Sequence, residues 1–112
     1  MKIAAVRRFA LSLPEAAEEP HFHFTSFRVR GKIFATAPPD GAHVHIFVAD
    51  EEREQALELD PEFVEKLHWG KRVVGVRIAL ANAKPAVVTR LLAQAWKRRA
   101  PRTLQDRVTG SW

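Results

Sequence analysis

The segment from Arg72 to Leu80 alternates between two faces, and this alternation constrains the fold more than any other feature of the chain. One face carries four aliphatic side chains, Val74, Val76, Ile78 and Leu80, and the other carries Val73, Gly75, Arg77 and Ala79. A two-residue period is typical of a β-strand, because successive side chains of a strand point to opposite sides. A strand is not stable alone, so the chain must supply partner strands.

Those partners are predicted between residues 24 and 49. Residues 24–37 indicate a hairpin whose turn is Arg30-Gly31-Lys32, and Pro38-Pro39-Asp40-Gly41 forms a second turn. Residues 43–49 then alternate again, with Val44, Ile46 and Val48 opposite His43, His45 and Phe47. Phe22 and Phe24 occupy even-numbered positions and Phe27 and Val29 odd-numbered ones, so a regular strand would place the two pairs on opposite faces. This predicts a bulge, or a strand that begins only near Thr25.

Helical periodicity flanks these strands. It predicts helices over residues 3–13, 50–59 and 84–99, a short helix after Asp60-Pro61 that carries Phe63, Val64 and Leu67, and a loop over residues 68–71. Residues 15–19, between Pro14 and Pro20, allow only a turn of helix. The predicted order is α-β-β-β-α-α-β-α, an α+β fold in which helices pack over one face of an antiparallel sheet.

Length and composition indicate one domain without thiol chemistry. The chain has 112 residues, 46% hydrophobic and 28% charged, which is enough for one core; we expect a domain over residues 1–101 and a polar tail over 102–112. The absence of cysteine excludes disulfides, thiolate metal sites and cysteine nucleophiles. No apolar run approaches the roughly 20 residues of a membrane span, and Arg7 and Arg8 interrupt the apolar start, so a cytoplasmic location is expected.

Positive charge is concentrated in the second half of the chain. The formal net charge is +5, and residues 51–66 are mainly acidic. Beyond residue 70 the only acid is Asp106, against ten bases: Lys71, Arg72, Arg77, Lys84, Arg90, Lys97, Arg98, Arg99, Arg102 and Arg107. This asymmetry favours a polyanionic partner, although basic proteins that bind no nucleic acid are common.

Several segments resemble the MmcQ/YjbR family. They are Ala10-Leu11-Ser12-Leu13-Pro14-Glu15, His21-Phe22, the stretch from Ser26 to Ala35 (SFRVRGKIFA), Asp60-Pro61-Glu62, Gly75-Val76-Arg77-Ile78, Leu91-Leu92 and Ala95-Trp96. The resemblance covers about residues 3–101. It implies a bacterial frataxin-like α+β fold and DNA binding through two hairpin wings.

The candidate DNA-binding residues lie on these wings. Arg28, Arg30 and Lys32 surround the first turn, Lys71, Arg72 and Arg77 belong to the second wing, and Arg98 and Arg99 are auxiliary. Contacts of this kind would be made to phosphates and would tolerate any base sequence. The alternatives are a solvated sheet face for the wings and, for the helix end, bases that complement the helix dipole.

Other patterns give weaker indications. His21 and His23, like His43 and His45, can share a strand face, but an intervening strand separates the pairs, and we expect no metal site. No nucleophile elbow, phosphate loop or paired acid is present, so neither a catalytic residue nor a cofactor is predicted.

The sequence leaves three roles open for Trp69. Beside Lys71 and Arg72 it can stack on a base, fill a pocket on a partner or cover its own core. Two alternative functions therefore stand beside DNA binding. The chain could be a protein-interaction module, favoured by the charge split, or it could bind a small ligand between sheet and helices in a pocket lined by Trp69 and the histidines.

Overall fold

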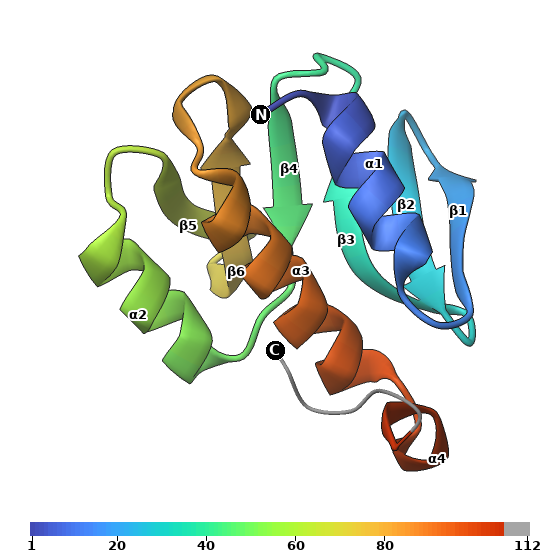
Figure 1. The fold of residues 1–112 in the computed structure, drawn as a ribbon. Coiled ribbons are helices and arrows are strands. Elements are labelled where there is room, and N and C mark those ends of the chain that lie inside the picture. Colours follow the sequence, from blue (N-terminus) through green and yellow to red (C-terminus); the bar gives the residue numbers. More distant parts are fainter. Residues whose placement is uncertain (107–112) are drawn as a thin grey trace.

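A computed structural model describes residues 1–106 of the chain (Figure 1). Its strands are β1 (Ala16–His21), β2 (Phe24–Val29), β3 (Lys32–Ala37), β4 (His43–Ile46), β5 (Val64–Trp69) and β6 (Arg72–Ala79). Its helices are α1 (Ile3–Ser12), α2 (Asp50–Leu59), α3 (Pro85–Arg99) and α4 (Arg102–Gln105), with a 3₁₀ turn at Leu80–Asn82. None of these helices, within residues 1–106, is long and apolar enough to cross a membrane.

The strands form one antiparallel sheet in the order β1-β2-β3-β4-β6-β5. Because each neighbour runs in the opposite direction, β2 and β5 run the same way across this sheet. The turn after β2 and the turn after β5 therefore lie at the same end of the sheet. The first is Arg30-Gly31, with φ of 50° and 78°, the left-handed pair that a tight two-residue hairpin requires.

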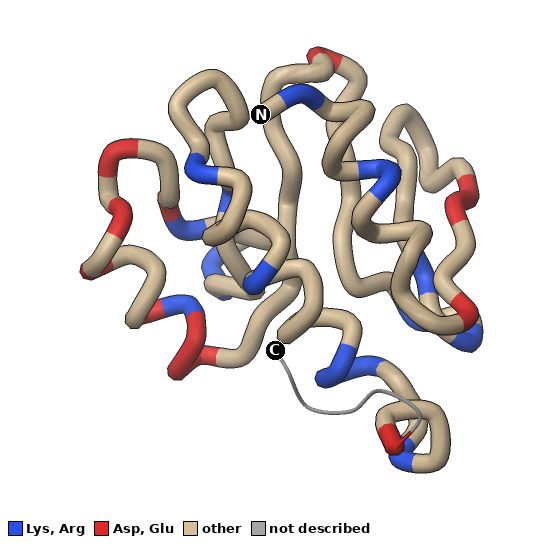
Figure 2. The backbone as a smooth tube through the Cα atoms, in the orientation of Figure 1, with Lys and Arg blue, Asp and Glu red and all other residues tan. Residues whose placement is uncertain are grey.

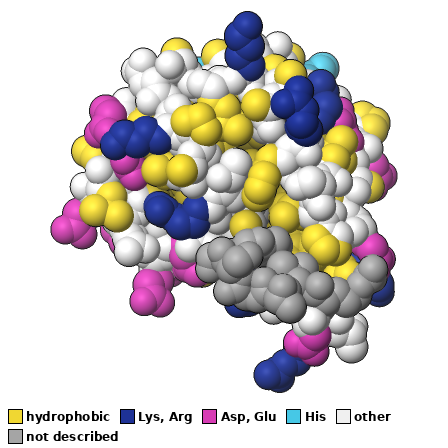
Figure 3. Space-filling model, viewed as in Figure 1, with side chains coloured by type: hydrophobic (Ala, Val, Ile, Leu, Met, Phe, Trp, Pro, Cys, Tyr) yellow, Lys and Arg dark blue, Asp and Glu magenta, His cyan; other side chains and the backbone are white. Residues whose placement is uncertain are grey.

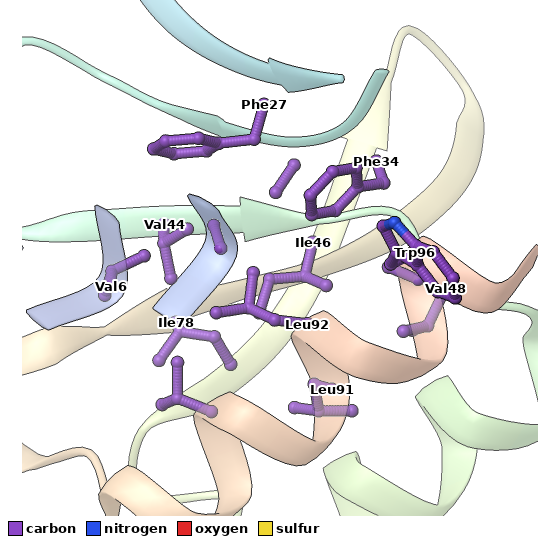
Figure 4. Packing of buried hydrophobic residues seen from close by; sticks show 14 of the residues in the cluster. Val6, Phe27, Phe34, Val44, Ile46, Val48, Ile78, Leu91, Leu92 and Trp96 are labelled. Atoms are coloured by element: carbon purple, nitrogen blue, oxygen red, sulfur yellow. The ribbon is translucent and has the colours of Figure 1, made fainter. Parts of the chain in front are cut away.

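Helices α1 and α3 lie across one face of the sheet, and α2 lies beside β5 (Figure 1). The core fills the space between α3 and the sheet, where Phe34, Ile46 and Ile78 meet Leu92 and Trp96 (Figure 4). The Trp96 indole is fully buried, and its Nε1–H donates to the Pro14 carbonyl at 3.0 Å. That bond satisfies the polar atom of the largest core side chain and ties α3 to the end of α1.

The α+β class and the antiparallel sheet with packed helices are confirmed. Two segments differ from the expectation. Of residues 15–19, predicted as a helical turn, residues 16–19 belong to β1. The short helix and loop predicted over residues 61–71 are a turn at residues 61–63, the strand β5 and the turn that follows it. Both are edge strands, which tolerate Pro20 and exposed charges because one side of the backbone pairs with no neighbour. Pairing with β2 and β6 overrides the local preference for helix.

The last described helix, α4, packs against the core through Leu104, which is 1% exposed. Residues 107–112, the rest of the predicted polar tail, lie outside the described residues. The division at residue 101 stays a prediction.

Candidate functional site

The face of the sheet opposite α1 and α3, which we call the open face, carries a polar row across the strands. Directly paired residues of antiparallel strands point to the same side. The register therefore aligns Glu19, Ser26, Thr36, His45, Arg77 and Glu65. Phe24 and Arg28 share this side because each lies two residues from Ser26.

Two of the predicted DNA-binding arginines lie on the open face, and carboxylates hold both. Arg77 Nη1 is 2.9 Å from Glu65 Oε1. Arg28 Nε donates to Ser26 Oγ at 2.9 Å and lies 3.9 Å from Glu19 Oε2, and its side chain is only 22% exposed. These arginines are committed to contacts within the sheet.

Arg30 is also paired, but in solvent. It lies in the β2–β3 turn, where its guanidinium makes a bidentate contact with Glu15 at 2.6 and 3.0 Å. The Arg30 side chain is 53% exposed, against 38% for Arg77 and 22% for Arg28, so it is the most accessible of the three to an anion.

The remaining predicted residues gather at one end of the sheet. Lys32 follows the β2–β3 turn, Lys71 lies in the β5–β6 turn and Arg72 directly follows it, and Arg98 and Arg99 end α3 (Figures 1 and 2). Within residues 1–106 none of these five side chains lies in an ion pair. Arg98 Nη1 donates to the Phe47 carbonyl at 3.1 Å, which fixes its position. We call these five residues the cationic end.

The helix side of the molecule is different. There the described Lys and Arg side chains stand as separate patches among acidic and apolar ones (Figure 3). The described residues in this view form no continuous basic stripe for a ligand with several regularly spaced negative charges (Figure 3).

A groove of about 600 Å³ runs over the open face and reaches the cationic end. It forms where β4 stops at Ile46, leaving Phe47 and Val48 to line the gap, and where Arg98 and Arg99 approach from α3. Phe24, Leu67 and Val73 add apolar surface, and Arg72 adds a cation from the hairpin. Asp50, a carboxylate that also lines the groove, is paired with Arg53 at 2.8 Å.

Two aromatic side chains stand in solvent at the groove. Trp69 is 71% exposed at the end of β5, and Phe22 is 88% exposed in the β1–β2 turn. Trp69 therefore does not cover its own core. Phe22 also has φ of 59°, a left-handed conformation that is unfavourable for a bulky side chain.

Two residues that line the groove, Arg99 and His45, each have a buried nitrogen without a hydrogen-bond partner within residues 1–106. These atoms are Arg99 Nε and His45 Nε2. Burial, followed by repulsion from Arg77 and His43, lowers the pKa of His45, so its imidazole is neutral at pH 7. Its other nitrogen, Nδ1, lies 3.5 Å from Thr36 Oγ1.

The histidine pairs separate in space. His21 and His45 line the groove, whereas His43 Nδ1 lies 2.8 Å from Asp40 Oδ2. No three His, Asp or Glu side chains of residues 1–106 come together as metal ligands would.

The groove was not predicted from the sequence in this form. A pocket lined by Trp69 and histidines was expected between sheet and helices, but it lies on the opposite side of the sheet. The sequence signal that could have located the groove was the position of Phe24 in its strand. Phe24 shares the face of Ser26 and Arg28 and not that of Phe27, and the bulge lies between Phe27 and Arg28.

Comparison with known proteins identifies a similar fold and a matching family. The chain is similar to the Deinococcus radiodurans protein DR2400, a DUF419-domain protein of known crystal structure, with a TM-score of 0.73 and 15% identity over 97% of this chain and 83% of that one. No curated protein matches the sequence. The YjbR family matches residues 11–98, most of the chain, including α3 and every strand. The chain therefore belongs to the YjbR family.

Proposed function

We propose that this chain binds DNA through the cationic end of its sheet. The observation that carries the proposal is that five cations from two hairpins and one helix lie at one end of the sheet and form no ion pair within residues 1–106: Lys32, Lys71, Arg72, Arg98 and Arg99. Arg30, which is exposed at the tip of the first hairpin, is auxiliary. Arg28 and Arg77, included in the sequence-based set, hold the sheet together instead.

Phosphate contact is the chemistry that this arrangement favours. Each cation that neutralises a phosphate releases condensed counterions, and that release drives binding irrespective of base sequence. Two hairpin turns at the same end of a sheet can lie against one strand of phosphates. No reaction and no catalytic residue are part of the proposal.

A double substitution tests it. Lys71→Ala with Arg72→Ala removes two charges from one exposed turn and disturbs no buried contact. The matched control is Lys2→Ala with Arg90→Ala, which removes the same charge from α1's start and the outer side of α3. We expect the first variant to lose about tenfold or more of its affinity for a labelled DNA in fluorescence anisotropy, and the control to lose little. Equal losses of DNA affinity in the two variants would contradict the proposed site, because they would show that binding depends only on net charge.

A further inference from the structure

We infer that the groove on the open face receives unpaired bases of a DNA strand whose phosphates lie on the cationic end. The inference rests on the proposed function for the identity of the partner, and adds that the strand is single. Two features carry it: an exposed indole beside exposed cations, and an apolar groove of suitable size.

The indole and the cations belong to one turn. Trp69 and Arg72 are directly paired across the β5–β6 hairpin, and Gly70-Lys71 joins them. An indole this exposed gains nothing from its own core, whereas its flat face can stack on any base. A base stacked there has its phosphate within the reach of Lys71 and Arg72.

The groove continues this surface with the chemistry that bases need. Its volume, about 600 Å³, lies in the range of roughly 300–1,000 Å³ typical of small-molecule sites. Phe24 and Phe47 provide further ring surface. Phe22, strained and exposed at the β1–β2 turn, stands where a second base can stack.

A duplex cannot use these features. Its bases are stacked inside the helix, so their flat faces are unavailable to Trp69 or to the groove. A duplex can still place its phosphates on the cationic end. The two forms of DNA therefore differ in which residues they need.

The test compares three probes: a labelled oligothymidylate, a duplex of the same length and thymidine monophosphate. Trp69→Ala removes the stacking surface from an exposed site, and Leu59→Ala, on exposed α2 surface, is the matched control. We expect the single strand to bind more tightly than the duplex, and Trp69→Ala to weaken the single strand about tenfold while leaving the duplex nearly unchanged. Lys71→Ala with Arg72→Ala should weaken both.

Different failures have different meanings. If Trp69→Ala leaves single-strand binding unchanged while the duplex binds through Lys71 and Arg72, this inference is overturned and the proposed function stands. If neither form of DNA binds at low salt, the proposed function itself fails. If thymidine monophosphate binds in a Trp69-dependent manner and the strand does not, the groove serves a free nucleotide, and the inference is again overturned.

Discussion

Arg77 Nη1 donates to Glu65 Oε1 at 2.9 Å across the outermost strand pair of the sheet. The contact places an arginine charge and a carboxylate side by side on the open face, next to His45 in the same row. Cross-strand pairs of this kind stabilise a sheet by about 0.2–1 kcal/mol. An arginine engaged in this way is a poor candidate for phosphate contact.

Arg77→Ala is therefore expected to leave DNA affinity within about twofold of the unmodified chain, since it removes a charge that Glu65 already neutralises. Glu65→Ala is the informative partner, because it frees Arg77 and raises the net charge. We expect it to tighten binding modestly. Fluorescence anisotropy with one labelled DNA measures both. A loss from Arg77→Ala as large as that from Lys71→Ala with Arg72→Ala would show that the assignment of roles is wrong.

Gly75 occupies a place where no side chain fits. A Cβ built on it would lie against the Ile46 carbonyl and close to Phe47 Cα, both of which belong to backbone. Gly75→Ala should therefore lower the free energy of unfolding by about 3 kcal/mol or more, at the upper end of overpacking costs. Urea denaturation provides the value.

Gly70→Ala is the matched control for that experiment. Gly70 has open space around it, but its φ is 60°, so alanine there carries only the left-handed penalty of about 1–2 kcal/mol. If the two alanine variants proved equally stable, the close approach of Gly75 to β4 would be contradicted.

Leu92 fills the centre of the core between α3 and the sheet and is completely buried. Leu92→Ala should lower the free energy of unfolding by about 2–5 kcal/mol, because it leaves a cavity in addition to the lost burial. Leu59→Ala, at a position that is 59% exposed, should change it by no more than about 0.5 kcal/mol. Thermal unfolding monitored by circular dichroism tests this prediction. Equal unfolding temperatures for the two variants would contradict the central position of Leu92 in the core.

The stability of the fold should also depend on pH through His45. Its pKa is lowered by burial first and then by Arg77 and His43, with Asp40 and Glu65 opposing the shift. Between this lowered pKa and the ordinary value of about 6.5, the unfolded chain binds more protons than the folded one. The free energy of unfolding should therefore fall as the pH decreases through that window.

Denaturation at a series of pH values from about 8 to about 5 tests this prediction. His45→Gln, which cannot be protonated, should flatten the curve across the window relative to the unmodified chain. A curve that keeps the same slope after the substitution would assign the pH dependence to other groups.

The sequence predicted those elements whose pattern is set by burial. Residues 72–80 alternate because one side faces the core, and α3 has an apolar stripe because it packs on the sheet. The edge strands could not be predicted in this way. β1 is mostly exposed and contains Pro20, and β5 exposes Glu65, Lys66 and Trp69, so their strand conformation comes from pairing with a neighbour.

The sequence identified the charged residues of the site, but it could not show which of them form ion pairs. The alternation in each hairpin identified Arg28 and Arg77 as lying on the faces opposite the aliphatic rows. Their carboxylate partners, Glu19 and Glu65, lie on the two strands that the pattern missed. Arg98 donates to the Phe47 carbonyl at the groove although 51 positions separate the two residues, and no local pattern reports such a contact.

The salt dependence of DNA binding tests the central claim most directly. Five cations on phosphates would give a slope of log Kobs against log salt of up to about −4.5 on duplex DNA, at roughly 0.9 per phosphate, and Lys71→Ala with Arg72→Ala would reduce its magnitude by about 1.8. The account predicts both the steep slope and the reduction. A slope near zero, or one that the double substitution leaves unchanged, would contradict it.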